Sequence, residues 1–334
     1  MSSLRWLQAQ SVYKTYFNLR RNPFEITPDP YFLCRTERHN ETLAMLYYGV
    51  TQHKGFVVMT GDMGTGKTLL VHCLIEILNT QRIPYAYVFN TRLSPLGFLQ
   101  YVVGDLGLSS SAKDKSRLLL DLGSYLVACH QKGLTTVLVV DEAHHLSSEV
   151  LEEIRLLTNL ETAQQKLLQI VLAGQPELEQ KLELPQLRQL KQRITVRSRL
   201  APLNRQETKA YIEHRLELAS AERQTYALFS PEAIDRVYLY SQGVPRVINT
   251  LCENALITAV AERDRFVTRE SVDKVAVGFR LPQQHANRSE SARNDELVQA
   301  VTTLLQIHQR LQSTHQGQRM FPPSLGAHKH ESDF

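Results

Sequence analysis

The segment GDMGTGKT, residues 61–68, constrains the fold of this chain more than any other feature. It matches the pattern G-x-x-x-x-G-K-[ST]. A buried apolar run, GFVVMTG, precedes it and predicts a strand, and residues 68–78 have the apolar spacing of a helix. Glycines in such a loop let backbone N–H groups turn inward around phosphates, and the helix N-terminus adds partial positive charge. The strand, loop and helix together predict a phosphate-binding loop.

Each part of this loop has an expected task toward ATP. Lys67 would reach the terminal phosphates, and Thr68 would offer its hydroxyl to Mg²⁺. We expect the residues that contact the nucleotide to be Gly61, Asp62, Met63, Gly64, Thr65, Gly66, Lys67, Thr68 and Leu69.

Two carboxylates follow a second apolar run. Four apolar residues, 137–140, lead into Asp141 and Glu142, which places both acids at the carboxyl end of a central strand. Asp141 would hold Mg²⁺ through water, so Thr68 and Asp141 form the predicted metal site. Glu142 would polarise the water that attacks the terminal phosphate. Lys67, Asp141 and Glu142 thus predict an enzyme that hydrolyses ATP to ADP and phosphate.

Short apolar runs alternate with helical stretches between about residues 56 and 200, which predicts an α/β fold with a parallel sheet. Five strands are expected, at residues 55–61, 84–90, 135–142, 167–174 and 193–200. Four helical segments follow, at 205–219, 231–241, 245–262 and 268–277. They predict a small, all-helical lid domain after the sheet.

The predicted domain division has four parts. Residues 1–50 form an N-terminal segment with a first helix, 51–203 the nucleotide-binding α/β domain, and 204–281 the helical lid. Residues 282–334 have the composition of a disordered tail. Within this tail, 295–311 is amphipathic and would serve either as a docking helix or as an extension of the helical domain.

Composition limits the location and the cofactors. The chain has no stretch of about 18 apolar residues and no apolar run near residue 1, so we expect neither a transmembrane segment nor a signal peptide and place the chain in the cytoplasm. The four cysteines form no C-x-x-C pair, which argues against a zinc site and against a disulfide framework. A net charge of +4 leaves nucleic-acid binding open.

The letters DEAH at residues 141–144 also occur in helicases. Such helicases carry a second motor domain, and the segments after residue 204 supply no strands for one. His144 and His145 are too adjacent to serve readily as two ligands of one metal ion. We expect both to be polar residues near the site.

Several ordered motifs resemble one family of AAA+ ATPases, the ExeA/GspA-type secretion ATPases, which include MshM-like proteins. The resemblance spans about residues 16–281 and rests on YFNLRRNPFEITPDPYFL, GFVVMTGDMGTGKT, VLVVDEAHHLSSEVLEEIRLLTNLET, KLLQIVLAGQPEL, LRQLKQRI and GVPRVINTLC. The chain departs from the family pattern in two ways. His144 stands where glutamine is usual, and we find in the sequence neither the transmembrane segment nor the peptidoglycan-binding region that often follows the ATPase.

The resemblance implies roles for further residues. Arg193, or else Arg188, would be the arginine finger that a neighbouring subunit receives, and Arg246 the sensor 2 arginine. Gln175 would take the sensor 1 role. Asn159 would either link the glutamate to the nucleotide state or cap a helix. Residues 22–24 (NPF) and 28–32 would pack beside the adenine.

The resemblance favours an ATPase that forms a homo-oligomeric ring or filament with ATP. It would organise partner proteins of a secretion, pilus or exopolysaccharide system, and those partners would hold it peripherally at the inner membrane. The alternative is a TnsC/MuB-like ATPase that binds duplex DNA and regulates transposition. The segments KQRITVRSR and NLRRN offer some basic residues for this, but not a run with interleaved aromatics. A third hypothesis, a scaffold that binds ATP but barely hydrolyses it, is disfavoured by the complete set of Lys67, Asp141 and Glu142.

Overall fold

The computed structural model describes residues 13–89, 92–108, 114–163, 165–221 and 228–281. The chain divides into two compact units, Met1–Val275 and Ala276–Phe334. The first unit contains the sheet and most of the helices. The tail predicted at 282–334, with its amphipathic stretch at 295–311, lies outside the described residues.

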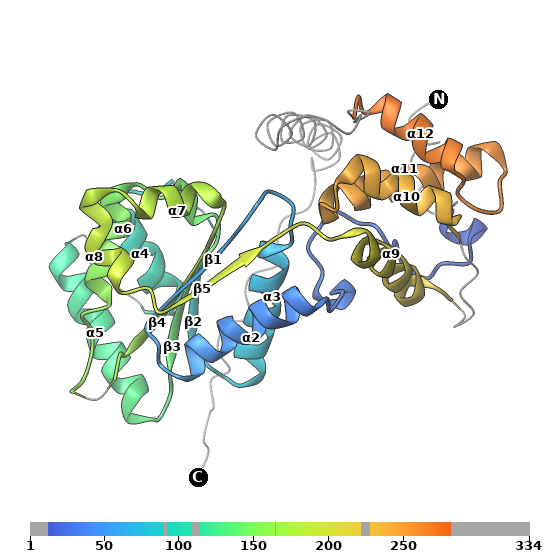
Figure 1. Ribbon diagram of the computed structural model, residues 1–334. Coiled ribbons are helices and arrows are strands. Elements are labelled where there is room, and N and C mark those ends of the chain that lie inside the picture. Colours follow the sequence, from blue (N-terminus) through green and yellow to red (C-terminus); the bar gives the residue numbers. More distant parts are fainter. Residues whose placement is uncertain (1–12, 90–91, 109–113, 164, 222–227, 282–334) are drawn as a thin grey trace, which may run out of the picture. The chain divides into compact units, whose positions relative to one another are not determined.

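Five parallel strands form one sheet in the order β2-β3-β4-β1-β5 (Figure 1), which confirms the predicted fold class. The strands are β1 (Phe56–Gly61), β2 (Tyr85–Val88), β3 (Thr136–Val140), β4 (Leu168–Gly174) and β5 (Val196–Leu200). Strand β5 begins three residues later than expected, because the preceding helix runs to Gln192 and Arg193 forms its C-terminal cap.

The helices alternate with the strands and then continue alone, as predicted. They are α2 (Glu37–Thr51), α3 (Lys67–Thr80), α4 (Pro95–Asp105), α5 (Lys115–Gln131), α6 (Ser148–Leu157), α7 (Pro176–Leu182), α8 (Arg188–Gln192), α9 (Arg205–Ala219), α10 (Pro231–Ser241), α11 (Pro245–Glu262) and α12 (Arg269–Gly278). Three short 3-10 turns are η1 (Pro30–Phe32), η2 (Ala143–His145) and η3 (Pro185–Leu187).

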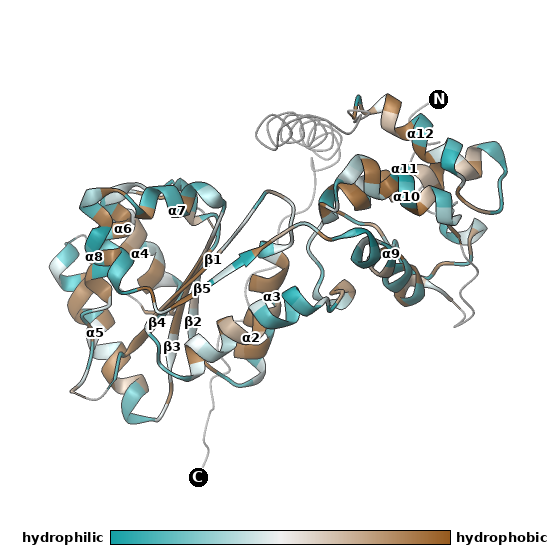
Figure 2. Cartoon of the chain, viewed as in Figure 1, coloured by the Kyte–Doolittle hydropathy of each residue, from teal (hydrophilic) through white to brown (hydrophobic). Residues whose placement is uncertain are grey.

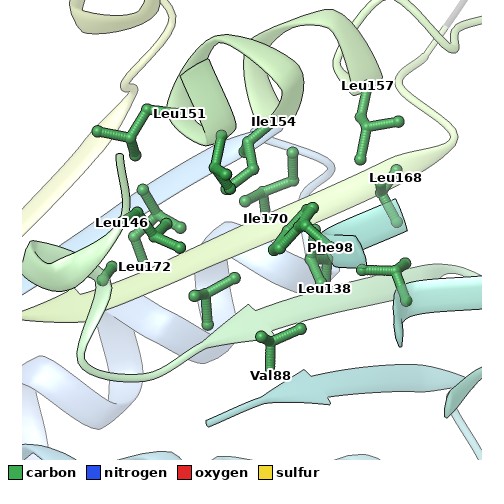
Figure 3. Packing of buried hydrophobic residues seen from close by; sticks show 14 of the residues in the cluster. Val88, Phe98, Leu138, Leu146, Leu151, Ile154, Leu157, Leu168, Ile170 and Leu172 are labelled. Atoms are coloured by element: carbon green, nitrogen blue, oxygen red, sulfur yellow. The ribbon is translucent and has the colours of Figure 1, made fainter. Parts of the chain in front are cut away.

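Each face of the sheet packs against its own set of helices. Helices α2 and α3 cover one face through a core that includes Leu46, Leu70 and Leu74. Helices α4 to α8 cover the other face, where Leu151, Ile154 and Leu157 of α6 meet β3 and β4 around Phe98 (Figure 3). Strands β1, β3 and β4 are buried at every position and mostly hydrophobic (Figure 2), because both of their faces are covered. Strand β5, at the sheet edge, is more polar.

The strand order brings three loops to one edge of the sheet. Strand β4 lies between β1 and β3, with Thr60 of β1 beside Gly174 and Val140 of β3 beside Leu172. The loops that follow these three strands therefore emerge next to one another. In open parallel sheets this edge is where ligands bind.

The N-terminal segment is tied to the helical region. Phe24 is fully buried with its ring edge against Phe229. Asn22 and Tyr13 donate hydrogen bonds of 3.0 and 3.2 Å to the two carboxylate oxygens of Glu253 in α11. Burial raises the pKa of Glu253 to about 7. The charge of Glu25 adds to this rise, whereas the hydrogen bonds and the charge of Lys14 oppose it.

This buried carboxyl group predicts pH-dependent stability. The pKa of Glu253 is higher in the folded chain than its ordinary value of 4.5, so the folded state binds this proton more tightly. Its contribution is complete below about pH 4.5 and is lost as the pH rises through about 7. We expect Glu253→Gln, which stays neutral, to raise the thermal midpoint relative to the unaltered chain at pH 8 but not at pH 5. Differential scanning fluorimetry measures this difference, and an equal effect at both pH values would contradict the assignment.

Candidate functional site

Lys67 is the first residue of α3, directly after the loop that follows β1. Its Nζ donates hydrogen bonds to the backbone carbonyls of Gly61, at 2.8 Å, and Asp62, at 2.9 Å. The side chain is 5% exposed, and this burial lowers the pKa of Lys67, whereas the carboxylates of Glu142 and Asp141 oppose the decrease. The loop thus holds a cation at the N-terminus of a helix, where the partial charge also favours an anion.

Two glycines of the loop adopt backbone angles that other residues avoid. Gly64 has φ +81° and Gly66 has φ +104°. A Cβ atom on Gly64 would lie 2.8 Å from Cβ of Arg246, and one on Gly66 would lie 3.3 Å from Nε2 of His39. Arg246 N also donates a 3.3 Å hydrogen bond to Gly64 O. Helices α2 and α11 therefore both pack directly on the loop.

Thr68 and Asp141, the predicted metal site, contact each other. Thr68 Oγ1 donates a 2.8 Å hydrogen bond to Asp141 Oδ2, and Asp141 Oδ1 accepts one of the same length from the backbone N–H of Glu142. Burial raises the pKa of Asp141, and the hydrogen bond from Thr68 is the largest effect that opposes this rise. A hydroxyl and a carboxylate oxygen side by side are the donor set that Mg²⁺ prefers at a phosphate site.

Glu142 turns sharply out of β3 and faces His144. Its backbone has φ 50° and ψ 35°, in the left-handed region. Glu142 Oε2 lies 3.3 Å from His144 Nδ1, which already accepts a 3.4 Å hydrogen bond from the backbone N–H of Gln175. Burial lowers the pKa of His144 to about 4, so the ring is neutral and no proton lies between the two acceptors.

Two buried polar atoms fit a phosphate chain and an attacking water. Among the described residues, neither Glu142 Oε2 nor Arg246 Nε has a hydrogen-bond partner. Burial lowers the pKa of Arg246, and the charge of Glu142 opposes this. The charge of Glu142 acts on Lys67, and Arg246 packs on Gly64 of the phosphate-binding loop. A γ-phosphate would satisfy the unpartnered donor of Arg246, and its attacking water would satisfy the unpartnered acceptor of Glu142. The residues present therefore fit ATP with Mg²⁺.

The sequence predicts that His144 and His145 are too adjacent to bind one metal ion, but the structure brings their ring nitrogens close together. Ligand atoms of Glu142, His144 and His145 lie within 4.8 Å of one another. The two imidazole rings are tilted by 39° with centroids 3.9 Å apart, so they lie side by side.

The arginines predicted for the finger lie away from this loop. Arg193 donates a hydrogen bond to Thr158 Oγ1 at the C-terminus of α6, and Arg188 is exposed at the start of α8. Asn159 is exposed just beyond the same end of α6. The 10 residues of α6 span roughly 15 Å, and the turn of Glu142 adjoins the opposite end. This separation disfavours a direct link between Asn159 and the glutamate.

The NPF segment faces the helical region. Phe24 is buried against Phe229, and Pro23 O accepts a hydrogen bond from Arg215 of α9. Phe32 is buried beneath the guanidinium of Arg215. Residues 30–35, together with α2, α3 and α9, line an open groove of about 750 Å³ that includes no residue of the phosphate-binding loop.

Sequence patterns missed two groups of contacts around the site. His39 of α2 lies 3.4 Å from Thr65 O through Nε2, and its Nδ1 lies 2.7 Å from Thr36 Oγ1. Lys181 and Glu179 of α7 bind the backbone near Glu142 and the side chain of Thr60, respectively. Both groups come from distant parts of the chain, and no local spacing pattern marks them.

Comparisons with known proteins identify relatives of this chain. Residues 50–182 match the family model of the AAA domain. The chain is 42% identical to general secretion pathway protein A of Aeromonas hydrophila over 266 residues, which cover 79% of this chain and 48% of that protein. The chain thus spans about half the length of this curated relative.

Solved structures share the fold at low sequence identity. Cdc6p of Pyrobaculum aerophilum superposes with a TM-score of 0.60 at 16% identity, covering 76% of this chain and 70% of that one. Drosophila ORC bound to DNA gives a TM-score of 0.58 at 18% identity, over 94% and 80% of the two chains. In the part of this chain that the structure describes, every helix is too short or too polar to cross a membrane.

The close approach of Gly64 and Arg246 predicts a binding defect. We expect Gly64→Ala to weaken nucleotide binding at least tenfold, because a methyl group at φ +81° must displace either the loop or Arg246. Titration with a fluorescent ADP analogue measures the affinity. Gly104→Ala is the matched control, since a Cβ there meets no atom within 4 Å. Unchanged affinity in Gly64→Ala would contradict the geometry.

Proposed function

Because this chain is a homologue of general secretion pathway protein A with an AAA domain, we propose that it hydrolyses ATP and uses the cycle to organise partner proteins. The partners would belong to a secretion, pilus or exopolysaccharide-type envelope system, and they would hold the chain peripherally at the inner membrane. The observation that supports hydrolysis best is the convergence of Lys67, the Thr68–Asp141 pair and Glu142 at adjoining strand ends.

In this mechanism each polar or charged side chain of the site has a separate role in ATP hydrolysis. Lys67 and Arg246 would bind the terminal phosphates and stabilise the charge that develops there. Glu142 Oε2 would accept a hydrogen bond from the attacking water and aim it along the line of the breaking bond. Thr68 and Asp141 would hold Mg²⁺, which supplies charge neutralisation between the phosphate oxygens. Gln175, at the end of β4 between the two motifs, would report on the terminal phosphate as sensor 1.

Assembly would complete the site. Arg193 lies at the end of α8, away from the loop of its own chain, so it would serve the nucleotide of a neighbouring copy. We therefore propose a homo-oligomeric ring or filament that forms with ATP. Residues 51–203 would bind the nucleotide, and residues 204–281 would act as the lid that carries Arg246.

Substitutions separate hydrolysis from assembly. We expect Glu142→Gln to lower ATP turnover at least 100-fold while it keeps ATP-dependent assembly, because the amide is similar in shape but lacks the negative charge that polarises the water. Arg193→Ala should lose both. Arg188→Ala tests the alternative finger, and it should leave both properties unchanged if Arg193 is the finger. Phosphate release and light scattering with ADP or ATP measure the two properties. If Glu142→Gln turns over ATP at the normal rate, hydrolysis by this site is excluded.

Duplex DNA is the second candidate partner, and one observation favours it. Arg197 and Arg199 alternate with the half-buried residues Val196 and Ser198 along the edge strand β5, and both arginines are exposed. If DNA is the partner, fluorescence anisotropy at low salt should show ATP-dependent binding that the double variant Arg197→Ala, Arg199→Ala weakens at least tenfold. Absence of binding by the unaltered chain with ATP would remove this candidate and leave the envelope system.

A further inference from the structure

Lys181 of α7 binds the turn that carries Glu142. Its Nζ donates hydrogen bonds to two backbone carbonyls, those of His144 at 2.7 Å and Leu146 at 2.6 Å. These carbonyls lie at the end of η2, which begins directly after Glu142. Hydrogen bonds from a charged donor are stronger than those between neutral groups. One side chain therefore fixes the end of this turn.

Glu142 requires such a restraint. Its left-handed backbone, at φ 50°, is unfavourable for a residue with a Cβ atom and persists only where the surroundings hold it. Asp141 Oδ1 accepts the N–H of Glu142 and holds the turn from the strand side. Lys181 holds it from the other side. Loss of either restraint would let the glutamate backbone relax toward other conformations.

Helix α7 is itself held in place by both neighbouring strands. It begins directly after Gln175 at the end of β4, and Leu178 and Leu182 are fully buried. Glu179 accepts a hydrogen bond from Thr60 Oγ1 of β1, one residue before the phosphate-binding loop. The helix thus connects the strand that carries the loop to the turn that carries Glu142.

We propose that Lys181 is a positioning residue for ATP hydrolysis, which fixes the backbone of Glu142 so that its carboxylate faces the attacking water. Its Nζ bonds to the turn, so it acts through Glu142 and contributes nothing to nucleotide affinity. This inference rests on the proposed function, because it assigns a role within the same reaction.

The first test compares turnover with affinity. Lys181→Met keeps the length of the side chain but removes both hydrogen bonds, and we expect kcat to fall at least tenfold while the Kd of a fluorescent ATP analogue changes less than twofold. Lys181→Arg, which retains charged donors, should recover kcat to within threefold of the unaltered chain. Lys274→Met, at an exposed lysine of α12 paired with Glu262, is the matched control and should leave both values unchanged. If Lys181→Met fails to fold, Lys181→Gln takes its place in the same comparison.

The second test shows whether Lys181 acts through Glu142. We expect the double variant Glu142→Gln, Lys181→Met to be as slow as Glu142→Gln alone, because positioning has no effect once the carboxylate is gone. Three results would each overturn the role of Lys181. The first is a double variant whose kcat is lower than that of Glu142→Gln by the full factor seen in Lys181→Met. The others are a weaker Kd or a normal kcat in Lys181→Met itself. If the unaltered chain lacks turnover when assembled, the proposed function fails and this role fails with it. Turnover that survives in Lys181→Met overturns the role of Lys181 alone.

Discussion

The pairing of β4 with both β1 and β3 is the interaction on which the rest of the site depends. Parallel hydrogen bonding keeps Thr60 beside Gly174 and Val140 beside Leu172, so three loops leave the sheet at one edge. A change of register by one residue would turn every side chain of these strands to the opposite face. Burial of both faces makes such a change very unfavourable. The hydrophobic core therefore fixes the positions of Lys67 and Asp141 relative to each other.

Polar groups at this edge are arranged for a ligand more than for the stability of the chain alone. Glu142 Oε2 and Arg246 Nε are buried without hydrogen-bond partners among the described residues, and each such group costs about 1–3 kcal/mol. The left-handed backbone of Glu142 adds a cost of order 1 kcal/mol. Folding of the surrounding sheet supplies the free energy that maintains these features. A phosphate chain would satisfy Arg246 Nε, and a bound water would satisfy Glu142 Oε2.

Contacts from distant segments shape the loop itself. His39 in α2 approaches Gly66, and Arg246 in α11 approaches Gly64. The phosphate-binding loop therefore contacts one residue that precedes it in the sequence and one that follows it. The N-terminal segment, in turn, is bonded to α9 and α11 through Arg215 and Glu253. A movement of α11 would therefore displace Arg246 from the loop and strain the hydrogen bonds to the N-terminal segment. Such coupling is the physical basis on which a helical region can respond to a nucleotide.

The sequence by itself determined the sheet, the helices that follow it and the four residues Lys67, Thr68, Asp141 and Glu142. These features are encoded by apolar periodicity and by contiguous motifs, whose geometry depends on a few neighbouring residues. Only the tertiary structure decided that Lys181 binds the turn of Glu142 and that Arg246 packs on Gly64. The physical reason is separation along the chain, because strand order and helix packing bring such residues together and no local pattern records the contact.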